Sequence, residues 1–327
     1  MATSAISIEH RAERLQQSRN LIDTVVLVGG MTVLMAAAAF LILGWQGLLL
    51  AVLGVGLLAF AAPNIPPSYV MRVYRAKPID RRNGRDFYLI LNELVARAGM
   101  SKIPNLYVVP SLTLNAFSVG TPDACAIAVT EGLLRKLSLR SVAGVLAHEL
   151  SHIRNNDLRL MALADAMTRA MQVLSWLGLA LIVFYIPQYF AGSTRIPWAG
   201  AILLYLAPAL STLLQLALSR TREFDADVDA VALTGDPEGL AMALAEIERY
   251  QGNILEDLVF PNTRRTPQPS LLRTHPATPE RLARLQAIRS PVGESPLAIG
   301  AETPRISLVG MPPSAMRPRY RFPGLWF

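Results

Sequence analysis

The chain has 327 residues, enough for one or two domains with a sizeable core. Hydrophobic residues make up 52% of it, charged residues 17%, and its mean hydropathy is +0.34, so the composition indicates a membrane protein rather than a soluble one. The net charge of +7 does not indicate a nucleic-acid-binding protein, because no basic patch with interleaved aromatic residues is visible. Cys125 is the single cysteine, which excludes an intrachain disulfide and fits a cytosolic face.

The first 65 residues are predicted to form an amphipathic head, residues 1–20, and a transmembrane hairpin, residues 21–65. No Asp, Glu, Lys, Arg or His occurs in residues 24–71, a stretch far longer than the roughly 20 apolar residues that one span needs. We expect a tight turn at residues 44–47 between the two spans. The first apolar run is too long for the hydrophobic part of a secretory signal peptide.

A second transmembrane hairpin is predicted at residues 170–219, where Arg195 alone interrupts two uncharged stretches. Pro187 and Pro208 lie inside these stretches, so a buried hairpin that does not cross the bilayer remains the alternative. The segment after the first hairpin is rich in basic residues, as is typical of a cytoplasmic flank. These basic residues are Arg72, Arg75, Lys77, Arg81, Arg82 and Arg85.

The remaining segments are predicted to form one catalytic domain in two parts, residues 66–169 and 220–290. In the first part, a helix at 85–98 precedes strands at 105–109, 112–119 and 124–129, a helix beginning at Leu139, and a helical stretch at 157–169. In the second part, the last apolar helix continues to about Leu233 and another helix covers about 237–251. Residues 291–327, rich in proline and arginine, are expected to be a flexible tail.

The segment VLAHELSHIRNND, residues 145–157, carries the motif that indicates chemistry. His148 and His152 are four residues apart, so on a helix they project from one face and can bind one zinc ion. Glu149 lies beside them and can reach a water bound to that zinc. The alternative is a charged helical face with two solvated histidines. Because the flanking residues are apolar, the helix is expected to be buried, where unpartnered imidazoles are costly.

A catalytic zinc site needs a third protein ligand, and the chain has no glutamate between Glu149 and Glu223. In the segment SRTREFDAD, Glu223 and Asp227 share one helix face, so one can bind the metal while the other orients a histidine. Asp157 and Asp165 follow the motif too closely to turn back onto the metal. A solvated helix end, in which Arg220 and Arg222 pair with these carboxylates, remains the alternative.

Chain topology agrees with this assignment, because two predicted spans between the histidines and Glu223 return the chain to the same side of the membrane. The basic flank identifies that side as the cytoplasm. Glu223 follows the last apolar stretch by about four residues, roughly 6 Å along a helix, so we expect the metal close to the bilayer surface. Membrane-protein substrates are therefore favoured over freely diffusing peptides.

HELSH, a membrane hairpin, REFDAD and THPATPER, in this order, resemble the HtpX-type membrane zinc metalloproteases, relatives of the CaaX prenyl-protein endopeptidases. The resemblance covers about residues 20–290. It implies an α+β, mainly α-helical fold with a gluzincin-like protease domain and about four spans, and one Zn²⁺ per subunit. The implied ligands are His148, His152 and Glu223, with Glu149 as general base. The residues implied to support the metal or the substrate are Asp227, Asn115, His275 and Arg281, and Arg281 is implied to pair with Asp227.

The resemblance implies a stress-response endopeptidase of the bacterial inner membrane that cuts membrane proteins at the cytoplasmic face for quality control. An extended substrate is expected to pair with a strand edge near residues 124–129. A CaaX prenyl-protein endopeptidase and a catalytically inactive membrane adaptor are the alternatives. An intramembrane site-2-type protease is disfavoured, because charged residues such as Arg140 and Arg154 flank the motif. No nucleic-acid partner is expected.

Overall fold

The computed structural model describes residues 2–61, 65–82, 84–192, 198–259, 279–288, 297, 320–321 and 325–326. The chain divides into two compact units. Met1–Asn64 and Arg159–Arg220 form the first unit, here called the membrane unit, and Ile65–Leu158 and Thr221–Phe327 form the second, the catalytic unit. Each unit is therefore assembled from segments that are distant in the sequence.

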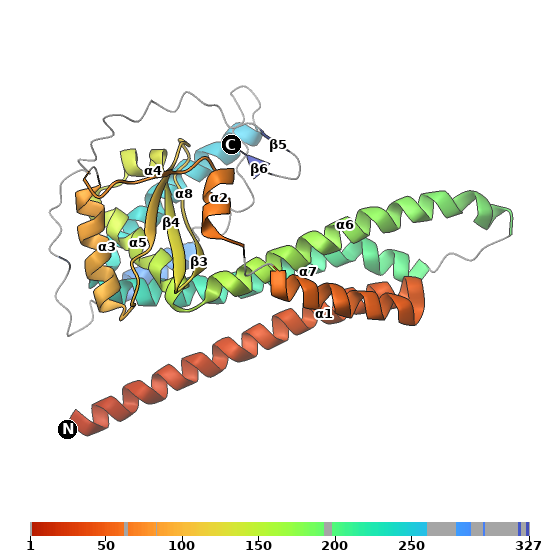
Figure 1. Ribbon diagram of the computed structural model, residues 1–327, viewed down its shortest axis with the longest axis horizontal. Coiled ribbons are helices and arrows are strands. Elements are labelled where there is room, and N and C mark those ends of the chain that lie inside the picture. The colour runs from red at the N-terminus through yellow and green to blue at the C-terminus, as the bar shows by residue number, and fades with distance from the viewer. Residues whose placement is uncertain are drawn as a thin grey trace. The chain divides into compact units, whose positions relative to one another are not determined.

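The membrane unit is built from α1 (Ala2–Ala61) and from most of α6 (Asp157–Phe190) and α7 (Trp198–Thr234), drawn in Figure 1. Within α1 the backbone turns at Gly44, whose φ of 61° confirms the predicted turn and suits glycine, which has no Cβ. Among the described residues, three helices are long and apolar enough to span a membrane: Leu43–Ala61, Asp157–Phe184 and Gly200–Thr234.

The described residues therefore contain three of the about four expected spans, and the apolar helix before the turn, Val25–Leu41, is a shorter apolar segment at the position of the fourth. The helices of this unit share a core of small and flexible apolar side chains, among them Met31, Met35, Met167 and Met171. Thr168 of α6 also bonds Ser211 and Gln215 of α7, which joins these two helices by polar contacts.

The catalytic unit contains a mixed sheet in the order β1-β2-β4-β3. Its strands are β1 (Lys77–Pro78), β2 (Asn105–Val109), β3 (Ala116–Thr121) and β4 (Ala124–Thr130). β4 pairs in parallel with β2 and antiparallel with β3, so both of its edges are occupied. The expectation that residues 124–129 offer a free edge is therefore wrong. In the described part of the chain the free edge next to β4 is the outer side of β3.

Side chains of the sheet alternate between two apolar layers, as the period of two in a strand requires. Cys125, Ile127 and Val129 of β4 join the core beneath α3 (Arg85–Arg97) and α5 (Leu139–Arg154). Ala126 and Ala128 face the other way, toward a smaller cluster with α2 (Pro67–Val73). Helices thus pack on both faces of the sheet, and α5 contacts β3 and β4 (Figure 1).

The first half of α5 is held by a local cap and by a long-range contact. Ser138 caps its start by accepting a hydrogen bond from the Ser141 amide, and α4 (Glu131–Lys136) precedes it. α8 (Pro237–Val259) packs closely against it at Gly144, where a Cβ would lie 2.9 Å from the Leu240 Cα. A glycine is required for this approach. α5 is consequently a rigid support for the motif that it carries.

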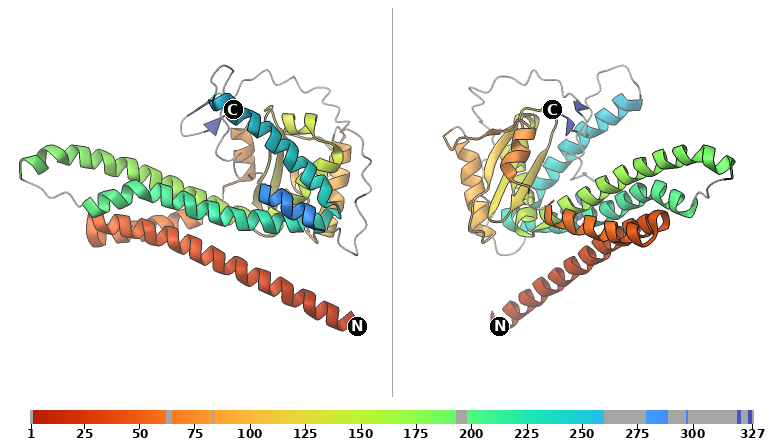
Figure 2. Two further views of the ribbon diagram at one scale, coloured as in Figure 1. Left: turned by 180° about the vertical axis from the view of Figure 1, so that it is seen from behind. Right: turned by 45° about the vertical axis from the view of Figure 1, so that its right-hand side comes forward.

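α9 (Pro279–Ala287) packs on α8, as Figure 2 shows from behind. In the predicted tail, the structure describes Leu297, whose amide donates a hydrogen bond to the Thr234 carbonyl at the end of α7. It also describes a short antiparallel pair, β5 (Tyr320–Arg321) and β6 (Leu325–Trp326). The parts of the catalytic unit that matter for the site are therefore β3, α5, α7, α9 and the start of α6.

Candidate metal centre

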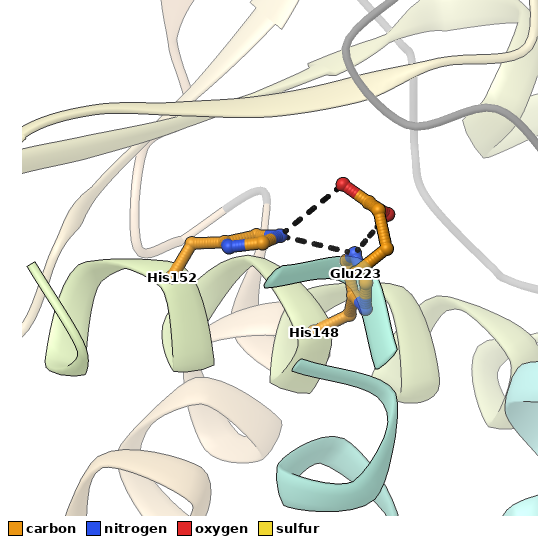
Figure 3. Close-up of side chains that lie close together, drawn as sticks. All are labelled: His148, His152 and Glu223. Carbon is orange, nitrogen blue, oxygen red and sulfur yellow. Dashed lines mark hydrogen bonds and ion pairs between the residues drawn. The ribbon is translucent and has the colours of Figure 1, made fainter. Parts of the chain in front are cut away.

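The histidines of the motif lie one turn apart on α5, near its C-terminal end (Figure 3). Both are buried, and their Nε2 atoms are 3.3 Å apart. The apolar neighbours Leu146, Leu150 and Ile153 place this helix in the main core. The alternative of two solvated histidines on a charged face is therefore wrong.

Glu223 reaches the two histidines from α7, on the part of that helix that belongs to the catalytic unit (Figure 3). Its Oε2 lies 3.3 Å from the His148 Nε2, and its Oε1 lies 3.8 Å from the His152 Nε2. One donor atom from each of these three residues lies within 4.8 Å of the others, and all three residues are buried. The solvated helix end considered as an alternative does not occur.

Donors about 2.0–2.2 Å from a tetrahedral zinc ion lie roughly 3.3–3.6 Å from one another. Two of the three separations, both 3.3 Å, match this range, and the third, 3.8 Å, is slightly longer. The other ring nitrogen of each histidine faces an aspartate at 3.1 Å, Asp227 for His148 and Asp157 for His152. With a proton on each Nδ1, both Nε2 lone pairs point at the same small space. Two lone pairs 3.3 Å apart repel unless a proton or a metal cation lies between them, so the donor set can bind a metal once His148 has lost its extra proton.

The first of two supporting chains of polar contacts consists of His148, Asp227 and Arg281. Arg281 of α9 donates to both oxygens of Asp227, at 2.8 and 2.7 Å, and its Nη1 lies 2.8 Å from Glu223. This two-point ion pair holds the Asp227 carboxylate beside the His148 ring. The resemblance had suggested this pairing of Arg281 and Asp227.

The metal-free centre gives His148 an unusual affinity for protons. Burial lowers the pKa of His148, but hydrogen bonds to Asp227 and Glu223 outweigh burial and raise the pKa to about 9. A proton and a metal ion therefore compete for the same Nε2 atom at neutral pH.

His152, Asp157 and Arg222 form the second supporting chain, which sequence reasoning missed. Asp157 Oδ2 lies 3.1 Å from the His152 Nδ1, and its Oδ1 accepts a hydrogen bond of 2.9 Å from Arg222. Asp157 does turn back, although toward a histidine rather than the metal. The backbone allows it because Asn156 has a φ of 60°, so the chain reverses locally before α6 begins. The Asn155-Asn156 pair was the available signal, since asparagine tolerates this conformation.

The charges of the centre are unbalanced by two. Among the residues that the structure describes, four carboxylates and two guanidiniums surround the histidines, each at most 4% exposed. They are Glu149, Asp157, Glu223, Asp227, Arg222 and Arg281. With neutral histidines, four negative and two positive charges leave a net charge of −2. Because uncompensated buried charge is costly, this count favours a divalent cation.

Two polar side chains of β3 or just before it are also buried, Ser118 and Asn115. Ser118 of β3 donates a 2.7 Å hydrogen bond to Glu149 Oε2, a contact that sequence reasoning also missed. Asn115, just before β3, is 9% exposed, and its Nδ2 has no hydrogen-bond partner among the described residues. His275 lies outside the described residues.

The fold and the centre together define an integral membrane protein with a buried cluster of two histidines and one glutamate that could hold a metal ion. The sequence profile of peptidase family M48 matches residues 83–289. The chain belongs to this family of metallopeptidases. It is similar along most of its length to proteins named protease HtpX homolog.

Among these relatives, the protein from Methylibium petroleiphilum is 33% identical over 286 residues, which cover 82% of this chain and 98% of that protein. The one from Paraburkholderia phytofirmans is 34% identical over 283 residues, covering 81% and 96%. The crystal structure of S. mikatae Ste24p aligns with a TM-score of 0.45 and 19% identity, covering 83% of this chain and 66% of that one.

Proposed function

We propose that the protein is a zinc-dependent endopeptidase that hydrolyses peptide bonds of membrane proteins at the cytoplasmic face of the bacterial inner membrane. His148, His152 and Glu223 would hold the zinc ion, and Glu149 would be the general base. The observation that carries this proposal is the convergence of three buried donor atoms within 4.8 Å of one another. The net charge of −2 around them supports a divalent ion.

When bound, zinc supplies the Lewis acidity that peptide hydrolysis needs. Glu149 takes the proton of the attacking water and gives it to the leaving amine nitrogen. Ser118 donates a hydrogen bond to Oε2 of Glu149 and so helps to orient this carboxylate. Asp157 and Asp227 hold the proton of each histidine on Nδ1, so that both Nε2 atoms remain available.

The free edge of β3 supports an extended substrate. Main-chain groups on this edge can pair with a peptide as an added strand, which gives affinity with little side-chain selectivity. Asn115 lies at the start of the same strand, and its unpartnered, buried Nδ2 can donate to a substrate carbonyl. Loose selectivity of this kind suits a protease of membrane-protein quality control.

The orientation in the membrane is proposed from the sequence. The basic residues between Arg72 and Arg85 are exposed and follow the second apolar helix, as expected for a cytoplasmic flank. A fusion of alkaline phosphatase after Gly192 should be active, and a fusion at the N-terminus should be inactive. The reverse pattern would contradict the proposed orientation.

The proposed chemistry is tested with protein purified in detergent, stripped of metal and given zinc. Wild-type protein should bind one zinc ion and cleave both itself and β-casein. Glu223→Ala should lose zinc. Glu149→Gln should keep zinc and lose about 10²–10⁴-fold in rate, the usual contribution of a general base.

Three results separate the alternatives. Stoichiometric zinc in Glu223→Ala would reject this ligand, and wild-type rates in Glu149→Gln would reject this base. Cleavage of a farnesylated CaaX peptide, with casein and the chain itself left intact, would instead identify a prenyl-protein endopeptidase. Zinc binding without hydrolysis of any of these would indicate an inactive adaptor.

A further inference from the structure

The carboxylate of Asp157 contacts two other buried side chains, those of His152 and Arg222, and the three residues come from three helices. His152 belongs to α5, Asp157 is the first residue of α6, and Arg222 lies on α7. His152 is 0% exposed, Asp157 1% and Arg222 4%. One carboxylate thus receives the imidazole on one oxygen, at 3.1 Å, and the guanidinium on the other, at 2.9 Å.

We propose that Asp157 is a positioning residue for the metal ligand His152, and that Arg222 acts through Asp157 by fixing the orientation of its carboxylate. The proposal rests on the zinc site described above. An aspartate that accepts the Nδ1 proton sets the tautomer and the ring orientation of a ligating histidine, and it raises the basicity of Nε2. Without Arg222, the carboxylate would be a buried charge free to rotate away from the ring.

The geometry of the chain indicates that this arrangement is built and not incidental. Asn156 adopts a left-handed conformation, which costs free energy for a residue other than glycine. Its effect is to end α5 and to begin α6 with Asp157 directed back at His152. The contact therefore compensates for an unfavourable backbone conformation, as expected where a side chain has to be placed.

The same pair also ties two long helices together. α6 and α7 both continue into segments apolar enough to span a membrane, and the Asp157–Arg222 ion pair joins them close to the ligands His152 and Glu223. A displacement of either helix end would therefore move the Asp157 carboxylate that orients His152. Metal affinity and the spacing of these two helices are expected to be coupled through Asp157.

The test measures the zinc dissociation constant by competition with a chromogenic chelator, and the Co²⁺ absorption spectrum, on full-length protein in detergent. Asp157→Asn should weaken zinc binding about tenfold, the lower end for partners that orient a metal ligand, and should shift the Co²⁺ bands. Arg222→Lys keeps the positive charge but not the planar fork, and should weaken binding about threefold. In the Asp157→Asn background, Arg222→Lys should add no further loss.

A matched control is available on the same helix. Asp165 and Arg169 of α6 form an ion pair of 2.8 Å whose side chains are 34% and 42% exposed and which does not include a metal ligand. Asp165→Asn removes the same charge as Asp157→Asn and should leave zinc affinity unchanged. Circular dichroism and monodisperse gel filtration verify that each variant is folded.

Each outcome decides the proposal. Unchanged zinc affinity and an unchanged Co²⁺ spectrum in folded Asp157→Asn would overturn the role of Asp157. Additive losses in the double variant would show that Arg222 acts by another route. If the wild-type protein does not bind zinc, the proposed function is wrong. If the wild-type protein binds zinc and cleaves, and Asp157→Asn does both equally well, only the role of Asp157 is wrong.

Discussion

The two supporting chains of the metal centre use the same chemistry but are built differently. On the His148 side, Asp227 lies on the same helix as the ligand Glu223, and Arg281 contacts both of these carboxylates. On the His152 side, Asp157 and Arg222 come from two helices, and Arg222 contacts the Asp157 carboxylate. The His148 side is therefore held by more contacts, and we expect its disruption to lower zinc affinity more than disruption of the His152 side.

The difference predicts unequal effects of one conservative change. Arg281→Lys keeps the charge but cannot make three contacts at once, so we expect zinc affinity to fall about 100-fold, the upper end for such partners. Arg222→Lys should lower zinc affinity far less. The chelator competition described above measures both variants. Equal losses would show that the contact of Arg281 with Glu223 adds nothing to metal binding.

The general base offers a variant that separates catalysis from metal binding. Ser118→Ala removes a hydrogen bond to the Glu149 carboxylate, so kcat for casein cleavage should fall about tenfold, as expected from the strength of bonds to charged groups. KM and zinc affinity should stay the same, because neither supporting chain includes Ser118. Ser118→Thr keeps a hydroxyl and should restore part of kcat. A fall in zinc affinity instead would place Ser118 among the residues that shape the metal site.

The His148 side should also release a proton when metal binds. The pKa of His148 is raised above the ordinary value of 6.5 to about 9 in the metal-free protein, so this histidine is protonated at pH 7.5 and must lose its proton to bind zinc. Calorimetry of zinc binding in buffers of different ionisation enthalpy should show about one proton released per zinc ion from this group. Asp227→Asn should reduce that release.

The same shift predicts how the stability of the metal-free protein depends on pH. A pKa that is higher in the folded state stabilises the protein fully below pH 6.5, and the stabilisation is lost as pH rises through about 9. Thermal unfolding of the stripped protein should therefore occur at lower temperature at pH 9.5 than at pH 6.5. The zinc-bound protein should lack this dependence, because zinc replaces the proton.

The smallest effect is expected for an ion pair remote from both chains. Asp236 caps α8 by accepting from the Gly239 amide and pairs with Arg140, whose hydrogen bond holds the pKa of Asp236 below its usual value. Asp236→Ala should lower the free energy of unfolding by about 1 kcal/mol, a typical cost of losing a cap. Zinc affinity should be unaltered, in contrast to the variants of either chain.

The parts of the centre that were predictable depend on local spacing. His148 and His152, like Glu223 and Asp227, are four residues apart, so helical geometry alone puts each pair on one face. The turn at Gly44 and the end of α7 before Asp236 were likewise indicated by residue type. Two apolar stretches between the pairs also indicated that both return to one side of the membrane.

What could not be predicted depends on chain reversals and strand order. Asp157 was dismissed because a continuing helix would carry it away from the histidines, whereas one left-handed residue, Asn156, turns it back. Arg222 was considered a partner of its neighbours Glu223 and Asp227, yet it crosses to α6. β4 became the interior strand because β2 pairs with it in parallel, which no local pattern specifies.

The amino-acid sequence by itself determined the membrane segments, the metal-binding residue types and their helical register, because these follow from composition and from periods of a few residues. Only the tertiary structure decided which buried carboxylate supports which histidine, which strand is left with a free edge, and which guanidinium balances which charge. Those pairings join residues far apart in the chain, and their free energy arises only when the packed core excludes water from them.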